Sequence, residues 1–84
     1  MDTKPQVLVI DDDAVVGRSF DRVLTKKGHE VNTALTGEEG LERIEAKNYD
    51  VVFTDIQMPG MNGMEVAEQI KTKCPWTPVV VITG

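Results

Sequence analysis

Three short runs of consecutive apolar, mostly β-branched residues constrain the fold of this chain more than any other feature. They are 7–10, 51–53 and 79–82. Runs of this length without polar alternation are typical of strands that are buried on both faces, as the strands of a parallel sheet are. A chain with such strands needs helices on both faces of the sheet to shield the strands from water.

Segments with helical periodicity separate these runs. In 14–27, apolar residues recur at the spacing of one helical face: Val16, Phe20, Val23 and Leu24. Asp13 stands just before this segment, where its carboxylate can cap the first turn of a helix. Gly28 follows the segment and suits the end of a helix. We therefore expect the first helix between the first apolar run and the next strand.

The remaining elements give weaker signals. Segment 29–35 mixes polar and apolar residues, as an edge strand does. Thr36 with Glu39 matches a capping box and predicts the start of a second helix. Asn62 with Glu65 predicts the start of a third. The residues expected to face the core are Leu41 and Ile44 in the second helix and Val66, Ala67 and Ile70 in the third.

The resulting order, βαβαβαβ, predicts an α/β fold with a doubly wound parallel sheet. The 84 residues of the chain correspond to one small domain. Right-handed crossovers would place helices on both faces of the sheet. We expect the strand order 2-1-3-4, in which the first strand pairs with the third. The chain ends at its most apolar strand, so we also expect possible self-association through 79–82.

Composition excludes several classes of partner. The formal net charge of −5 argues against direct binding of nucleic acid or of an anionic membrane surface. The single cysteine, Cys74, cannot form an intramolecular disulfide, which favours a reducing compartment. The sequence shows neither a signal peptide nor an apolar run long enough for a membrane span. We therefore expect a cytoplasmic location.

Carboxylates follow two of the predicted strands. Asp11, Asp12 and Asp13 come directly after the first run, and Asp55 closes the segment 51–55. Because ligands of open α/β sheets bind at the carboxyl ends of the strands, these acids are expected to converge there. Like charges at such short separation are unstable unless a cation lies between them. Oxygen-only ligands select a hard divalent ion, and Mg²⁺ fits best.

A carboxylate beside such a cation can act as a nucleophile toward phosphorus and form an aspartyl phosphate. The cation would offset the charge of both the carboxylate and the phosphoryl oxygens. Thr83 stands at the end of the last strand, where its hydroxyl could donate to one of those oxygens. The sequence therefore predicts a phosphoryl-accepting site.

Three blocks of sequence carry a family resemblance: 7–13, 51–63 and 79–84. In these blocks the chain resembles the receiver domain of two-component response regulators, which has a flavodoxin-like fold. The resemblance implies that Asp55 accepts a phosphoryl group from a histidine kinase or a phosphotransfer protein. It also implies that Asp11, Asp12 and the backbone carbonyl of Gln57 hold Mg²⁺ with Asp55. Thr83 would be the switch hydroxyl.

The loop after Asp55 has residues that shape a turn. Pro59 fixes φ and Gly60 permits a positive φ, and Gly63 follows at the start of the third helix. Receiver domains continue with a fifth strand that carries a lysine, and with further helices. The resemblance thus implies that 1–84 is a receiver domain incomplete at its C-terminus, with its output domain absent from this chain.

Other functions remain open at this point. A metal-dependent phosphatase with an aspartyl nucleophile would need an acid two residues after Asp55, where Gln57 stands, so we expect no turnover enzyme. A flavin-binding module would need backbone donors after the first strand, where 11–13 would repel its phosphate. A third alternative is a non-phosphorylated, truncated receiver fragment that acts as an assembly or domain-swapping unit.

Overall fold

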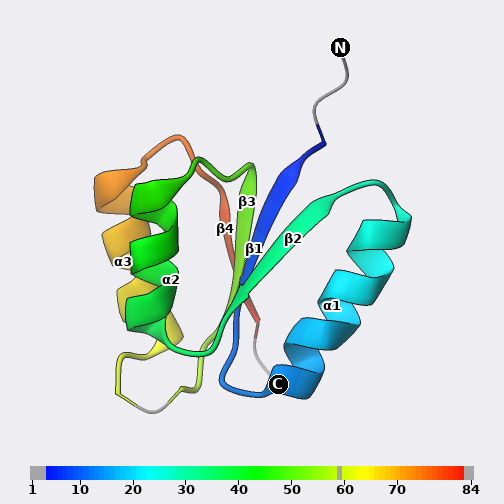
Figure 1. Cartoon of the computed structure of the whole chain (residues 1–84). Coiled ribbons are helices and arrows are strands. Elements are labelled where there is room, and N and C mark those ends of the chain that lie inside the picture. Colours follow the sequence, from blue (N-terminus) through cyan, green and yellow to red (C-terminus); the bar gives the residue numbers. More distant parts are fainter. Residues whose placement is uncertain (1–3, 59, 83–84) are drawn as a thin grey trace.

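The computed structural model describes residues 4–58 and 60–82, in which strands and helices alternate strictly (Figure 1). The elements are β1 (Gln6–Ile10), α1 (Ala14–Lys26), β2 (Glu30–Ala34), α2 (Gly37–Ala46), β3 (Val51–Asp55), α3 (Gly63–Lys73) and β4 (Val79–Ile82). This order confirms the one expected from the apolar runs and the helical segments between them.

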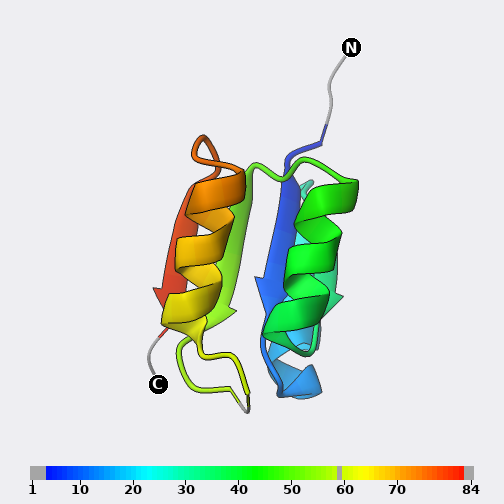
Figure 2. The ribbon, with the colours of Figure 1, turned by 90° about the vertical axis from the view of Figure 1, so that its left-hand side faces the viewer.

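The four strands form one parallel sheet in the order β2-β1-β3-β4, which confirms the predicted topology. Helices α2 and α3 lie side by side on one face, and α1 lies on the other (Figures 1 and 2). In the register of the two central strands, Ile10 lies opposite Thr54. The first residue after β1 and the last residue of β3 therefore meet at the same edge of the sheet.

The hydrophobic core lies between the sheet and the pair α2 and α3. Leu8, Ile10 and Val52 are fully buried from the sheet side, and Val66 and Ile70 of α3 are fully buried against them. These side chains come from alternate positions of each strand and from one face of the helix. Burial of this apolar surface is what holds α2 and α3 on the sheet.

Side-chain caps start all three helices where the sequence predicted them. Asp13, Thr36 and Asn62 each accept a hydrogen bond from a backbone N–H in the first turn. One detail of the capping box differs, because the Glu39 carboxylate accepts from the N–H of Leu35 and not from that of Thr36. Within the described residues, no helix combines the length and the apolar character needed to cross a membrane.

Helix α1 is the least buried of the described helices. Its apolar residues recur at the spacing of one helical face, but only Gly17 is buried, and Val23 is 53% exposed. Helix α1 packs mainly on β2 and β1, and its Phe20 ring lies 5.3 Å from that of Phe53 in β3. Val80, in the edge strand β4, is 44% exposed.

Strand β4 lies at one edge of the sheet, next to β3 alone. Within the described part of the chain, its outer backbone groups have no strand neighbour, which is the condition for pairing with another chain. Self-association through 79–82 therefore stays a prediction.

Candidate functional site

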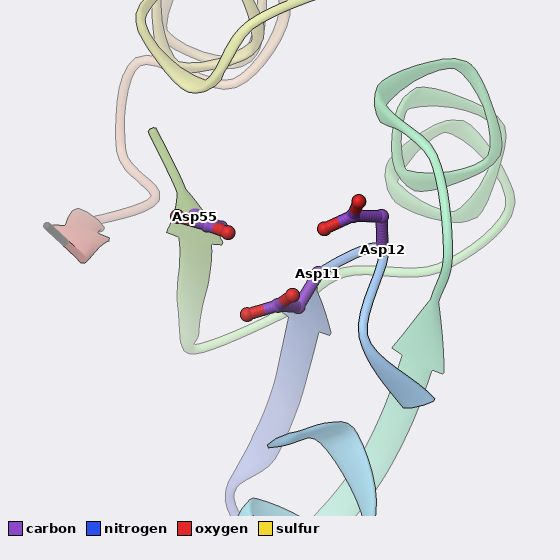
Figure 3. Close-up of side chains that lie close together, drawn as sticks. All are labelled: Asp11, Asp12 and Asp55. Carbon is purple, nitrogen blue, oxygen red and sulfur yellow. The ribbon is translucent and has the colours of Figure 1, made fainter. Parts of the chain in front are cut away.

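Three carboxylates meet at the carboxyl edge of the central strands. Asp11 and Asp12 follow β1, and Asp55 ends β3, 44 positions away from Asp11. One oxygen from each lies within 4.8 Å of the others. Figure 3 shows the side chains of Asp12 and Asp55 directed toward one another across this space. The pairing of β1 with β3 is thus what assembles the cluster.

Backbone hydrogen bonds hold these acids in position. The N–H of Asp11 donates to the carbonyl of Ala34 in β2 at 3.0 Å, which extends the sheet by one residue. The N–H of Asp13 donates to Asp11 Oδ1 at 2.9 Å, and that of Gln57 donates to Asp55 Oδ1 at 3.2 Å. Two of the carboxylates therefore each have one oxygen engaged by the backbone of the residue two positions later.

Burial and neighbouring charges disfavour the ionised form of Asp11. The residue is only 6% exposed, and burial raises the pKa of its carboxyl group above the ordinary value. The hydrogen bond from Asp13 acts in the opposite direction, and the negative charges of Asp55, Asp12 and Asp13 raise the pKa further. A cation among the three carboxylates would relieve this repulsion.

The donor set fits a hard divalent cation. All three side chains offer oxygen, and the oxygens that Mg²⁺ prefers come from one or two carboxylates and several waters. A separation of up to 4.8 Å between carboxylate oxygens leaves room for such a hydrated ion. The cluster opens into a hollow of about 470 Å³, which Val16 and Ile82 also line. Asp11, Asp12 and Asp55 could therefore hold Mg²⁺ and still leave space for a phosphoryl group.

Two glycines shape the loop between β3 and α3. Gly60 has a φ of 78°, in the left-handed region that glycine adopts without strain. Gly63 packs against the end of β3, because a Cβ there would overlap the carbonyl oxygen of Asp55 and lie 2.7 Å from the Cα of Ile56. Its N–H donates to the Ile56 carbonyl at 3.0 Å. The close approach fixes the start of α3 against the strand that carries Asp55.

The remaining predicted site residues are placed as follows. Gln57 is exposed beside Asp55, and the role of its carbonyl as a metal ligand stays a prediction. Asp13 caps α1 through a hydrogen bond from the N–H of Val15 at 2.9 Å. Thr83 and Pro59 lie outside the described residues.

Two apolar side chains that line the site were not predicted to belong to it. Val16 and Ile82 line the hollow beside the carboxylates, although the sequence pattern indicated only that they are part of an apolar helix face and an apolar strand. Their positions could have indicated this role, because Val16 lies in the first turn after the acids and Ile82 pairs with Asp55 in the sheet register.

The family model of the response regulator receiver domain matches residues 7–84. The DNA-binding transcriptional regulator NtrC of Escherichia coli is 39% identical over 78 residues, which are 93% of this chain and 17% of NtrC. The transcriptional regulatory protein TcrA of Mycobacterium tuberculosis is 32% identical over 79 residues, which are 94% of this chain and 31% of TcrA. The chain thus spans less than a third of either relative.

Solved structures agree with the fold. A CheY-like response regulator receiver domain protein from Methanospirillum hungatei superimposes with a TM-score of 0.95 at 32% identity, covering 98% of this chain and 66% of that one. The response regulator protein TrrA from Thermotoga maritima, solved in complex with Mg²⁺ and BeF, gives 0.90 at 37% identity, covering 94% of this chain and 69% of that one.

The raised pKa of Asp11 predicts a stability effect. A carboxyl group whose pKa is higher in the folded state opposes folding once the pH rises through that pKa. We therefore expect Asp11→Asn to increase the free energy of unfolding of the metal-free chain near neutral pH. The gain should shrink as the pH falls below the pKa of Asp11. Urea denaturation at several pH values measures this, and the exposed Glu68→Gln supplies the control for loss of one charge elsewhere. An equal gain from both variants would contradict the prediction.

The packing of Gly63 predicts a destabilised variant. In Gly63→Ala the added methyl group meets backbone on β3, which cannot move away as a side chain can, so the free energy of unfolding should fall by about 1–3 kcal/mol. Gly17→Ala is the matched control, because its Cβ lies 3.3 Å from the Thr33 methyl group and alanine favours the helix. Chemical denaturation should show a clear loss for the first variant and little change or a gain for the second.

Proposed function

The chain belongs to the response regulator receiver domain family, and from this premise we propose that it is a phosphoacceptor whose Asp55 takes a phosphoryl group from a phosphohistidine. The donor would be a histidine kinase or a phosphotransfer protein. The observation that carries the proposal is the cluster of Asp11, Asp12 and Asp55, with carboxylate oxygens within 4.8 Å of one another. TrrA, a structural relative, was solved with Mg²⁺ and BeF, which supports Mg²⁺ as the cation.

The residues of the cluster would have two roles, which are to bind the cation and to accept the phosphoryl group. Asp11 and Asp12, with Asp55 and the carbonyl of Gln57, would hold Mg²⁺, which supplies positive charge against the carboxylates and the phosphoryl oxygens. Asp55 is partly exposed, so a donor can reach it, whereas Asp11 is buried. The N–H of Gln57 engages Asp55 Oδ1, which leaves Oδ2 as the oxygen free to attack. Thr83 would donate its hydroxyl to a phosphoryl oxygen.

The transfer step is a substitution at phosphorus. Asp55 Oδ2 forms a bond to phosphorus while the bond between phosphorus and the donor imidazole nitrogen breaks. That nitrogen keeps the electron pair of the broken bond, and the histidine leaves as neutral imidazole because its other ring nitrogen carries a proton or takes one up from water. Water later cleaves the acyl phosphate and releases inorganic phosphate, restoring the carboxylate. A single transfer of this kind makes the chain a signalling module and not a turnover enzyme.

Phosphorylation of Asp55 would also carry a signal beyond this chain. NtrC and TcrA, which carry similar segments, are transcriptional regulators by name, so we propose that phosphorylation of Asp55 is read by an output domain. The acyl phosphate would shift the domain toward one of two conformations, because its interactions are more favourable in that conformation. A cytoplasmic location, a reducing compartment and the absence of direct contact with nucleic acid or membrane stay predictions.

Small phosphodonors test the acceptor directly. Incubated with acetyl phosphate and Mg²⁺, the unaltered chain should gain the mass of one phosphoryl group, and Asp55→Asn should gain none. Asp13→Asn is the matched control, because asparagine also caps helices and Asp13 lies outside the cluster of three. Equal labelling of the unaltered chain and of Asp55→Asn, by intact mass, would refute the proposal. The proposal would also be refuted if none of the three chains were labelled and the unaltered chain did not respond to beryllofluoride.

Removal of a carboxylate tests the cation site. At 100 times its dissociation constant, Mg²⁺ should raise the free energy of unfolding of the unaltered chain by about 2.7 kcal/mol, because it binds only the folded state. Asp12→Asn should weaken the affinity by about tenfold or more, whereas Asp13→Asn should change it little. Titration of thermal stability with Mg²⁺ measures both. A response that is the same in all three chains would place the cation elsewhere.

A further inference from the structure

One covalent reaction is open to Asn62 that the proposed function does not use. Asn62 is followed by Gly63, whereas Asn32 and Asn48 are followed by threonine and tyrosine. The backbone nitrogen of the residue after an asparagine can attack the side-chain amide, and a side chain on that residue hinders the approach. Glycine has no side chain and adopts the widest range of backbone conformations. Asn62 is therefore the asparagine of this chain that is chemically most prone to deamidation.

The reaction is a substitution at the side-chain carbonyl carbon. The nitrogen of Gly63 bonds to Cγ of Asn62 and gives up its proton, while the bond between Cγ and Nδ2 breaks and ammonia leaves with that proton. The product is a cyclic succinimide. Water then opens the ring in one of two ways. Attack at Cγ leaves aspartate at this position, and attack at the main-chain carbonyl carbon leaves isoaspartate, which has an extra methylene group in the main chain.

The folded chain withholds the attacking nitrogen. Gly63 is buried, and its N–H donates to the carbonyl of Ile56 at 3.0 Å. The side chain of Asn62 is held as well, because its Oδ1 accepts from the N–H of Glu65 at 3.0 Å in the first turn of α3. Asn62 itself is exposed, so water can reach it. The attack therefore needs an opening in which Gly63 leaves Ile56 and the cap of α3 is broken.

Gly63 also connects Asn62 to the carboxylate site. A Cβ on Gly63 would overlap the carbonyl oxygen of Asp55, so the start of α3 is packed directly on the end of β3. The loop that joins β3 to α3 lies at the edge of the sheet where β3 ends (Figure 2). A change in the main chain at Asn62 would therefore be transmitted to the residue that ends β3.

We propose that Asn62 is a deamidation site that the fold protects, and that isoaspartate at this position slows phosphoryl acceptance by Asp55. The second half rests on the proposed function. Aspartate caps a helix as well as asparagine does, and its charge is favourable at a helix N-terminus. Isoaspartate has a longer main chain and a shorter side chain, so it loses the cap and displaces Gly63 from Asp55. Time spent unfolded would thus be converted into a lasting loss of phosphoryl acceptance.

Peptide mapping by mass spectrometry tests the location and the protection. The chain is incubated at mildly alkaline pH in buffer and in urea, beside a free peptide of residues 60–66. Asn62 should deamidate at the rate of the peptide in urea and at least about tenfold more slowly in buffer, because only the opened fraction reacts. In urea, Gly63→Ala should slow the reaction, since its methyl group hinders the attacking nitrogen.

Three results of this mapping would overturn the inference. The first is an equal rate at Asn62 in buffer and in urea, because the fold would then give no protection. The second is a faster reaction at Asn32 or Asn48 than at Asn62 in urea. The third is an unchanged rate in Gly63→Ala, because the backbone nitrogen would then not be the attacking group.

Ageing in urea provides the product for a test of its effect. The aged chain is returned to buffer, and its isoaspartate form is isolated by chromatography. This form should accept a phosphoryl group from acetyl phosphate at least about tenfold more slowly than the unaltered chain, because small displacements of a reacting group are costly. Asn62→Asp, which equals the other product, should react at nearly the unaltered rate. Asn62→Gln forms the ring far less readily, so it should react equally before and after the same ageing.

Reaction with acetyl phosphate also separates this inference from the proposed function. Equal reaction of the isoaspartate form and Asn62→Asp would overturn the inference and leave the acceptor role intact. Slower reaction of Asn62→Gln after ageing would overturn it too, because the loss would then not depend on isoaspartate. Circular dichroism should show that the isoaspartate form stays folded, and its unfolding would contradict a local displacement. Lack of reaction in the unaltered chain before ageing would instead overturn the proposed function.

Discussion

The parallel pairing of β1 with β3 is the constraint on which the functional site depends. It brings Asp55 next to Asp11 and Asp12, which are far from it in the sequence, and the three carboxylates repel one another. This arrangement has an energetic cost at Asp11, because burial and the neighbouring negative charges raise the pKa of its carboxyl group. A fold that concentrates negative charge at one edge is suited to bind a cation there. The same edge is where open parallel sheets bind their ligands.

Much of the fold could be predicted because local patterns and tertiary packing agree. The runs that became β1, β3 and β4 are short and β-branched, and caps at Asp13, Thr36 and Asn62 mark the helix starts. The convergence of the acids followed from strand order alone, since the carboxyl ends of neighbouring parallel strands share an edge. Residues that end such strands can therefore be grouped from the sequence alone.

The packing of α1 could not be predicted in this way. Periodicity shows which side of a helix is apolar, but it does not show which strands lie beneath that side. Here Gly17 allows α1 to approach β2 closely, near Thr33, whereas Val23, beyond Phe20, remains 53% exposed. The contact between Gly63 and the Asp55 carbonyl was hidden for a similar reason. A glycine in a loop indicates a turn, but a close approach between two backbones depends on the tertiary structure and leaves no local signal in the sequence.

The most direct test of the central claim is a measurement of which carboxylates share one cation. With Mn²⁺ in place of Mg²⁺, paramagnetic broadening of the side-chain carboxyl ¹³C resonances reports proximity to the ion. At substoichiometric Mn²⁺ the account predicts that the signals of Asp11, Asp12 and Asp55 broaden together, ahead of those of Asp21 and Asp50. A sharp Asp55 signal beside broadened signals from Asp11 and Asp12 would contradict it, because the proposed phosphoryl acceptor would then lie outside the cation site.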